Sequence, residues 1–279
     1  MDKQAVREAV WDAFEAGDQA RFPFPPHDRI PNFAGADAAC ERLTATDEWA
    51  GAETLKCNPD APQLPVRRAA LRAGKTVYVA QPRLRDPDPF LRLDPAEIPP
   101  EEIDDATTVS GISEYGTPVG PGDVPRVDLV VAGSVGVTTD GARIGKGEGY
   151  SDLEWGVLSE LDAVGSEAQR ASGSEGQRPS GDRASPGESR TQSGDADTTV
   201  ATTVHELSVI DGPDSPVADG ADRPEPDAHD VPLDLIVTPE RTVRTETPYD
   251  RPSGIDWTAL DPERLDEIPV LAERAPERG

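Results

Sequence analysis

The stretch VDLVVAGSVGVTTDGARIGKGEGYSDLEWGVLSELDAV (127–164) decides the fold, because a strand, a glycine-rich turn and a helix follow one another in it. Its first part, 127–137, is a nearly continuous apolar run rich in β-branched residues, which is typical of a strand buried on both faces. Its last part, 151–164, has apolar residues at helical spacing, and Ser151 with Glu154 fits an N-terminal capping box. This order of elements predicts a layered α/β sheet.

The rest of the chain alternates between the same two patterns, which supports a layered α/β sheet. Helices are expected where apolar residues recur at helical spacing, and strands where short apolar runs contain β-branched residues. We predict helices over 3–16, 35–46 and 64–74, strands over 52–58, 75–81 and 199–210, one or two strands within 231–243, and a short helix with an apolar strap over 254–271.

One segment does not fit a packed domain. Only 35% of the 279 residues are hydrophobic, below the roughly 45–50% usual for globular chains. The segment 165–198 contains almost no apolar residue except alanine, so it cannot bury enough surface to offset the entropy of ordering it. We therefore predict a single domain, formed by 1–164 and 199–279, that is interrupted by a disordered, acidic, Ser/Gly-rich insertion at 165–198.

The charge is strongly negative: 54 acidic residues face 27 basic ones, for a formal net charge of −27. The acidic residues are spread over the whole chain and lysines are few, which favours a halophilic, haloarchaeal-type protein whose self-repulsion is screened by salt. The alternative is an acidic surface for a basic partner. This charge argues against nucleic-acid binding. The N-terminus is not a signal peptide and no apolar run is long enough to cross a membrane, so we expect a cytoplasmic protein. Cys40 and Cys57 lack metal-site spacing and are expected to be small buried residues.

The glycine turn has the composition of an anion site. Gly145, Gly147 and Gly149 alternate with other residues just before a predicted helix, where backbone N–H groups and the helix dipole favour negative charge. Glycine lets the backbone approach phosphate oxygens and adopt positive φ. Arg143 and Lys146 can neutralise the phosphate charge. The alternative is a tight surface turn whose basic side chains are merely solvated.

Two residues extend this hypothesis. Asp152, at the start of the helix, can hold a Mg²⁺ ion that bridges phosphates, and Tyr150 can stack on a flat ring or pack in the core. The turn matches neither the Walker A motif nor the dinucleotide fingerprint, so the residues alone do not identify the ligand.

Several motifs together resemble one family. The turn RIGKGEGYSD (143–152) is similar to the motif R-x-G-x-G-x-G-Y-Y-D of the 5-formyltetrahydrofolate cyclo-ligases, with Ser151 at an aromatic position. Lys3 and Arg7 fit the K-x-x-x-R of that family's first helix. Further matches are GISEYG (111–116), with Tyr115 in place of a usual Pro, and HDVPLDLIVT (229–238). The stretches 22–33, 82–85 and 143–154 most resemble a divergent branch, the methenyltetrahydrofolate synthetase domain-containing proteins.

The resemblance implies a fold, a reaction and a site. The fold would be a three-layer Rossmann-like α/β sheet (NagB/RpiA/CoA transferase-like), and the reaction would be conversion of 5-formyltetrahydrofolate to 5,10-methenyltetrahydrofolate with ATP and Mg²⁺. It implies ATP and a reduced folate as the partners of a monomer. It also implies catalytic roles for Lys3, Arg143 and Lys146; nucleotide contacts by these three and by Arg7, Gly145, Gly147, Gly149, Tyr150 and Asp152; folate contacts by Glu114 and Tyr150; and metal binding by Asp152 and Asp230.

Two departures from the family pattern keep other functions open. Ser151 replaces an aromatic residue, and AGSVGV (132–137) lacks the Pro and Phe of the family's P-G-x-A-F. Both are compatible with a non-catalytic regulator that binds a nucleotide or a folate. A third reading is a different α/β enzyme for phosphorylated small molecules, such as a sugar-phosphate isomerase, which would not need ATP.

Overall fold

The computed structural model describes residues 1–165, 197–217, 223–260 and 262–276. The predicted disordered insertion at 165–198 lies, apart from its first residue and its last two, outside the described residues.

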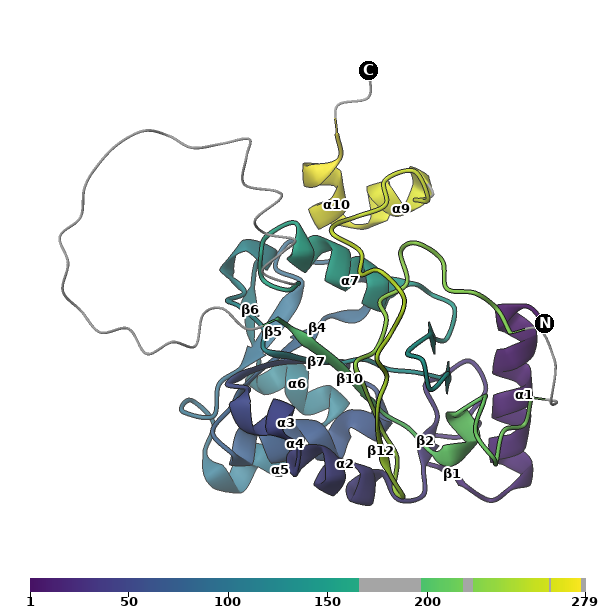
Figure 1. Ribbon diagram of the computed structural model, residues 1–279. Helices are drawn as coiled ribbons and strands as arrows, with labels where there is room; N and C mark the ends of the chain where they lie inside the picture. Colours follow the sequence, from purple (N-terminus) through teal and green to yellow (C-terminus); the bar gives the residue numbers. More distant parts are fainter. Residues whose placement is uncertain (166–196, 218–222, 261, 277–279) are drawn as a thin grey trace, which may run out of the picture.

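A central eight-stranded sheet organises the molecule (Figure 1), in the strand order β12-β11-β10-β7-β3-β4-β5-β6. The five consecutive strands from β11 to β4 are parallel, and antiparallel strands flank them on both sides. This confirms the predicted α/β class. The strands are β3 (Thr54–Cys57), β4 (Thr76–Ala80), β5 (Phe90–Leu93), β6 (Thr117–Val119), β7 (Leu129–Val131), β10 (Thr199–Thr203), β11 (Leu235–Val237) and β12 (Thr242–Arg244).

Helices cover both faces of the sheet. On one face α2, α4, α5 and α6 pack on side chains such as Leu129 and Val131, and on the other face α7 packs on Val130 (Figure 1). This alternation along β7 is what a strand buried on both faces requires. The helices are α1 (Lys3–Ala16), α2 (Ala36–Thr44), α3 (Asp47–Gly51), α4 (Leu64–Arg72), α5 (Ile103–Ala106), α6 (Val109–Tyr115), α7 (Tyr150–Ser159), α9 (Pro262–Glu267) and α10 (Pro269–Arg274).

The first helix lies apart from these two layers. Val6 and Val10 of α1 belong to a third apolar cluster, together with residues of two short hairpins. These hairpins pair β1 (Ala20–Arg21) with β2 (Asn32–Phe33), and β8 (Gly136–Val137) with β9 (Arg143–Ile144). The β8–β9 hairpin leads directly into the glycine turn, so α1 lies against the base of that turn.

The apolar run 127–137 does not form the single strand that the sequence predicts. The chain leaves the sheet after β7, and the run continues as β8 of the separate hairpin. The backbone passes close to the Ile30 side chain where it leaves, since a Cβ at Gly133 would lie 3.0 Å from it. The sequence also missed β5 and β6, because strands of three or four residues are too short to show a clear periodicity.

Gly111 of α6 provides a test of the helical layer. A Cβ at this position would lie 1.8 Å from the backbone oxygen of Asp105, which is inside van der Waals contact. We expect Gly111→Ala to lower the free energy of unfolding by about 1–3 kcal/mol, the usual cost of overpacking. Gly51→Ala is the matched control, because nothing lies within 4 Å of its added methyl group. Equal unfolding midpoints for both variants in urea would contradict this packing.

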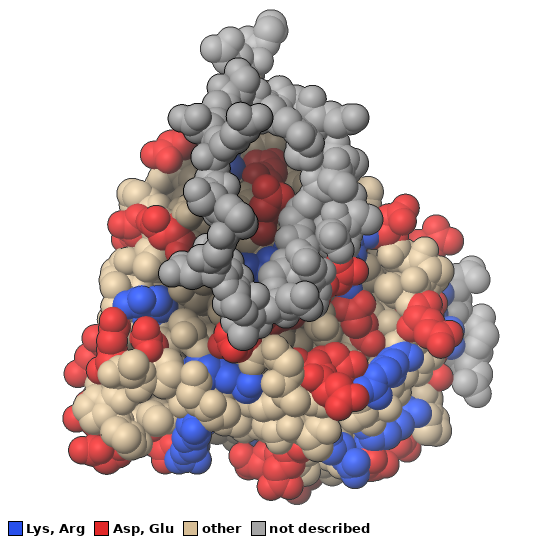
Figure 2. Space-filling view, turned by 60° about the vertical axis from the view of Figure 1, so that its left-hand side comes forward, with Lys and Arg blue, Asp and Glu red and all other residues tan. Residues whose placement is uncertain are grey.

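The surface is acidic, as the composition predicts. Figure 2 shows acidic side chains in several groups on one face, with basic side chains between them. Both cysteines are free and buried, which confirms the prediction for Cys40 and Cys57, and burial raises the pKa of the Cys57 thiol to about 11. Within the described ranges, no helix combines the length and apolar character that crossing a bilayer needs.

Candidate active site

A cleft of about 280 Å³ lies at the carboxyl ends of β3, β4 and β7. Its walls are the segment Asn58–Asp60 after β3, the segment 80–83 at the end of β4, Gly133 after β7, and the glycine turn with the start of α7. Parallel α/β sheets generally bind ligands at this edge, because the loops that follow adjacent strands meet there.

The glycine turn forms one wall of the cleft. Gly147 and Gly149 have φ values of 102° and 72°, the left-handed region that side chains disfavour. Gly149 is the N-cap of α7, and no side chain caps this helix end. The predicted capping box of Ser151 and Glu154 is therefore wrong: the helix begins at Tyr150, and the Glu154 side chain is used elsewhere. The first turn of α7 opens toward the cleft, as an anion site would require.

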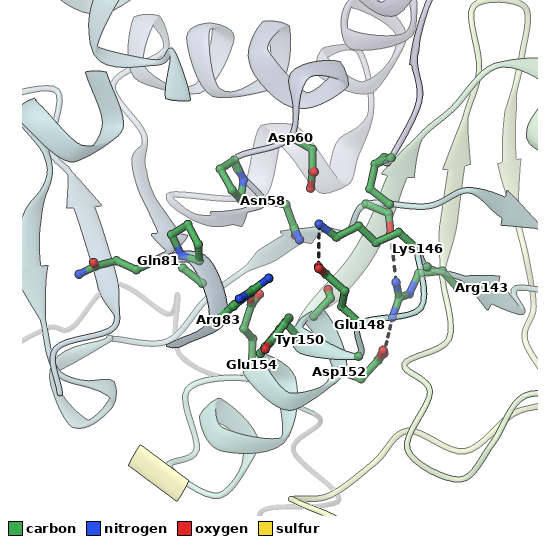
Figure 3. A pocket seen from close by; sticks show the side chains of 18 residues that line it. Asn58, Asp60, Gln81, Arg83, Arg143, Lys146, Glu148, Tyr150, Asp152 and Glu154 are labelled. Atoms are coloured by element: carbon green, nitrogen blue, oxygen red, sulfur yellow. Dashed lines mark hydrogen bonds and ion pairs between the residues drawn. The ribbon is translucent and has the colours of Figure 1, made fainter. Parts of the chain in front are cut away.

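Lys146 supplies positive charge inside this wall. Its Nζ lies 2.7 Å from Oε2 of Glu148, and Figure 3 shows the two side chains meeting in the middle of the cleft. Both are partly exposed, so this ion pair is screened and exchangeable. A bound anion can therefore replace Glu148 as the partner of Lys146 at a small cost in free energy.

Arg143 is buried at the base of the cleft. Its Nη1 donates to the Gly133 carbonyl at 3.0 Å, and its Nη2 donates to Oδ1 of Asp152. The Arg143 Nε–H has no acceptor among the described residues, which leaves one unsatisfied donor at this position. Arg143 thus links the exit of β7 to the start of α7 (Figure 3).

Asp152 lines the cleft but is already engaged. Its Oδ1 also accepts the backbone N–H of Val231 at 3.2 Å. Its Oδ2 has no partner in the part of the chain that the structure describes, so one carboxylate oxygen is available to a cation. The donor set here, one hard oxygen beside backbone N–H groups and a lysine, fits Mg²⁺ held jointly by protein and phosphate.

The two basic residues of α1 lie behind the turn and do not line the cleft. Arg7 Nε donates to the Gly145 carbonyl at 2.7 Å, and a Cβ on Gly147 would lie 3.3 Å from Arg7 Cζ. Arg7 therefore supports the turn from outside. Lys3 Nζ lies 2.6 Å from Asp227 and 2.5 Å from Asp230, so its charge is neutralised by that acidic segment.

Asp230 belongs to a small cluster of possible metal ligands. Ligand atoms of Asp227, His229 and Asp230 all lie within 4.8 Å of one another. Lys3 already sits between the two carboxylates and supplies the positive charge that a metal would bring. Asp230 does not line the main cleft.

Glu114 is the predicted site residue that the structure separates from the others. It is exposed on α6, in the helical layer, and is not part of the cleft wall. Six of the predicted residues do line the cleft: Arg143, Gly145, Lys146, Gly149, Tyr150 and Asp152.

The sequence analysis missed a buried ion pair beneath the cleft. Lys56, on the central strand β3, contacts Oε2 of Glu154 on α7, and both side chains are almost fully buried. Lys56 Nζ also donates to Oδ1 of Asn58 at 3.1 Å. The signal was present: a lysine inside an apolar strand predicts a paired or functional charge.

The loop after β3 was also missed, and it is held firmly. Arg67 is buried, and its Nη1 donates to the carbonyls of Asn58 and Asp60 at 2.6 and 3.1 Å. Gln63 accepts the Asn58 N–H at 2.8 Å. Burial lowers the pKa of the Arg67 guanidinium to about 10, so this cation stays charged at neutral pH. The Asn58–Asp60 wall is therefore preorganised.

The C-terminal segment reaches the other side of the turn. Arg264 Nη2 donates to the Glu148 carbonyl at 2.6 Å, and its guanidinium lies 5.2 Å from the centre of the Tyr150 ring. Tyr150 is thereby held beside the cleft by a cation–π contact.

The comparisons with known sequences agree on one family. The profile of the 5-formyltetrahydrofolate cyclo-ligase family matches residues 3–169. The chain is 37% identical over 97% of its length to the methenyltetrahydrofolate synthase domain-containing protein of Bos taurus, and 34% identical over 97% to that of Homo sapiens. It spans 61% of the length of each of these two relatives. A solved 5,10-methenyltetrahydrofolate synthetase from Aquifex aeolicus is similar with 15% identity and a TM-score of 0.46, over 90% of this chain and 96% of that one.

Proposed function

The chain belongs to the 5-formyltetrahydrofolate cyclo-ligase family, and on this premise we propose that its cleft uses ATP and Mg²⁺ to convert 5-formyltetrahydrofolate to 5,10-methenyltetrahydrofolate. The observation that carries the proposal is the cleft itself, in which Lys146 and the open N-terminus of α7 converge at the carboxyl edge of a parallel sheet. Such a site neutralises phosphate charge without a covalent nucleophile, which is what phosphoryl transfer needs.

The residues of the cleft suggest separate roles in binding phosphate, metal and folate. The N–H groups of the turn and the Lys146 ammonium would hold the phosphates, and Asp152 Oδ2 would hold Mg²⁺, which would supply further positive charge to neutralise the phosphates. Arg143 would keep Asp152 and the turn in place. The opposite wall, with Asn58, Asp60 and Ile30, would hold the folate so that its formyl oxygen faces the terminal phosphate. Positioning of this kind accounts for most of the catalysis in phosphoryl transfer.

The direct test is to add 5-formyltetrahydrofolate, ATP and Mg²⁺ to the protein in molar KCl and follow the absorbance of the methenyl product. Formation of the product that depends on both ATP and protein is the expected result. A folded protein that yields no methenyl product under these conditions would rule the proposal out.

Lys146→Ala should weaken the binding of Mg-ATP by about 1–3 kcal/mol, the range for a hydrogen bond to a charged group. The reason is that Lys146 belongs to the glycine turn and its side chain lines the cleft. The measurement is calorimetry, supported by the rise in melting temperature that Mg-ATP produces. Lys75→Ala is the matched control, because Lys75 lies outside the cleft and should leave the affinity unchanged. Equal affinities for the two variants would contradict the assignment.

A second function has one observation in its favour. Ser151 lines the cleft where the family motif has an aromatic residue, which removes a stacking surface. A regulator that binds a nucleotide or a folate without turnover would tolerate this change. Binding of both ligands by calorimetry, with no product formed, would favour the regulator; a melting temperature that ATP does not raise would favour an enzyme for other phosphorylated molecules. The halophilic character, the cytoplasmic location and the monomeric state remain predictions of the sequence.

A further inference from the structure

Four carboxylates line the cleft, and three of them are neutralised by a basic side chain. Glu148 pairs with Lys146, Asp152 with Arg143, and Glu154 with Lys56. Asp60 is different, since within the described ranges its carboxylate makes no ion pair and accepts no hydrogen bond from another residue. A lone carboxylate in a cleft is free to accept a proton from a ligand.

The position of Asp60 is well defined. Arg67 and Gln63 hold the backbone of its loop, and its side chain points into the cleft (Figure 3). The Oδ2 atom lies 3.4 Å from where a Cβ on Gly133 would stand, and the Ile30 side chain covers the same glycine. The carboxylate therefore lies between the exits of β3 and β7, beside an apolar contact, on the wall opposite the glycine turn.

Burial and neighbouring charges act on the Asp60 carboxyl in opposite directions. Burial raises the pKa of the Asp60 carboxyl above its ordinary value, while the positive charges of Lys146, Arg67 and Lys56 oppose this shift. Glu154 is the acidic group that faces it from α7. A carboxylate with a raised pKa holds an accepted proton better than a solvated carboxylate does.

The proposed reaction requires such a base. The substrate carries a hydrogen on N10, the amine nitrogen that closes the ring, and the methenyl product has none. We propose that Asp60 accepts this proton, an inference that rests on the proposed function. N10 forms a bond to the former formyl carbon, the N10–H bond breaks, and its proton passes to the Asp60 carboxylate. In the preceding step the formyl oxygen takes the terminal phosphoryl group of ATP and ADP leaves, so the former formyl carbon carries a phosphate. The bond from that carbon to the phosphate oxygen breaks after ring closure, and its electron pair leaves with inorganic phosphate.

Asp60→Asn tests this step apart from the earlier one. The amide cannot accept the proton, so we expect formation of the methenyl product to fall by about 100-fold or more. Phosphoryl transfer precedes the step, so ADP should still form and exceed the methenyl product, because water can return the activated formyl group to its starting state. Asp60→Ser should behave in the same way, and Asp60→Glu should restore part of the coupling. Asp104→Asn, a surface carboxylate on α5, is the control.

The pH profile gives an independent readout. Ring closure by the unaltered protein should decline as the pH falls through the pKa of Asp60, and this acid limb should be absent from Asp60→Asn. The rise in melting temperature with Mg-ATP should be the same in both proteins, since Asp60 lies across the cleft from the turn. If Asp60→Asn keeps the rate, the acid limb and one ADP for each product, the assigned base is wrong while the cyclo-ligase function stands. If the unaltered protein makes no methenyl product, both are wrong.

Discussion

Lys56→Met should lower the free energy of unfolding by about 3–5 kcal/mol, the cost of leaving one member of a buried ion pair without its partner. The Glu154 side chain is only 7% exposed and loses its ion-pair partner in this variant. The methionine fills nearly the same space, so the loss reports the unpaired carboxylate and not a cavity. Chemical unfolding at constant salt, followed by far-UV circular dichroism, measures the effect.

A double variant tests whether the loss of stability comes from the unpaired carboxylate. Lys56→Met combined with Glu154→Leu removes both charges, and a buried pair replaced by apolar residues of similar size is often neutral or stabilising. We expect the double variant to regain most of the lost stability. Arg72→Ala, which breaks an exposed pair with Asp104, should cost about 0–1 kcal/mol. If Lys56→Met alone lowered the free energy of unfolding as little as this control, the pair would not be buried in solution.

The loss in Lys56→Met should also depend on pH. Burial raises the pKa of Glu154 in the folded protein even beside Lys56. Without Lys56 this pKa rises further, so the folded variant binds a proton that the unfolded chain releases. That proton stabilises the variant at pH values below the unfolded pKa, and the benefit is lost as pH rises through the folded pKa. The difference in free energy of unfolding between Lys56→Met and the unaltered protein should therefore be smallest in acid and largest at neutral pH.

Arg143→Met should also cost about 3–5 kcal/mol, and it should abolish the rise in melting temperature with Mg-ATP. The change leaves the Asp152 carboxylate and the Gly133 carbonyl without their shared donor, and both lie beside the cleft. The exit of β7 and the start of α7 then lose the link that sets their spacing, so the turn cannot hold phosphate in one geometry.

Two further variants serve as comparisons for the stability and the Mg-ATP response of Arg143→Met. Arg143→Lys keeps the charge but not the planar guanidinium group that reaches two partners. Its free energy of unfolding and its Mg-ATP response should therefore lie between those of the unaltered protein and of Arg143→Met. Arg7→Met removes one partly exposed hydrogen bond to the Gly145 carbonyl and should cost about 1 kcal/mol. An Arg143→Met protein with native stability and an intact Mg-ATP response would overturn the role given to this residue.

Local pattern was enough to identify much of the architecture. The helical spacing over 3–16 corresponds to α1 at Lys3–Ala16, and the predicted strand 75–81 contains β4 at Thr76–Ala80. Burial on one face or on both leaves a period in the sequence that short windows detect. The glycine turn was found for a related reason: positive φ and close approach demand glycine at particular positions, and those positions are visible without a fold.

The tertiary structure decided which of the charged residues share the cleft. Lys56 and Glu154 are 98 positions apart, and Lys3 and Asp230 are 227 apart, so no local pattern could pair them. The strand order β10-β7-β3-β4 brings the exits of β3 and β7 together. Leu55 of β3 pairs with Leu129 of β7, although the two residues are 74 positions apart. The sequence by itself determined the elements and the turn, because these depend on neighbours along the chain. Only the folded sheet determined that Asp60 faces the turn and that Glu114 does not, because this depends on which loops the topology places at one edge.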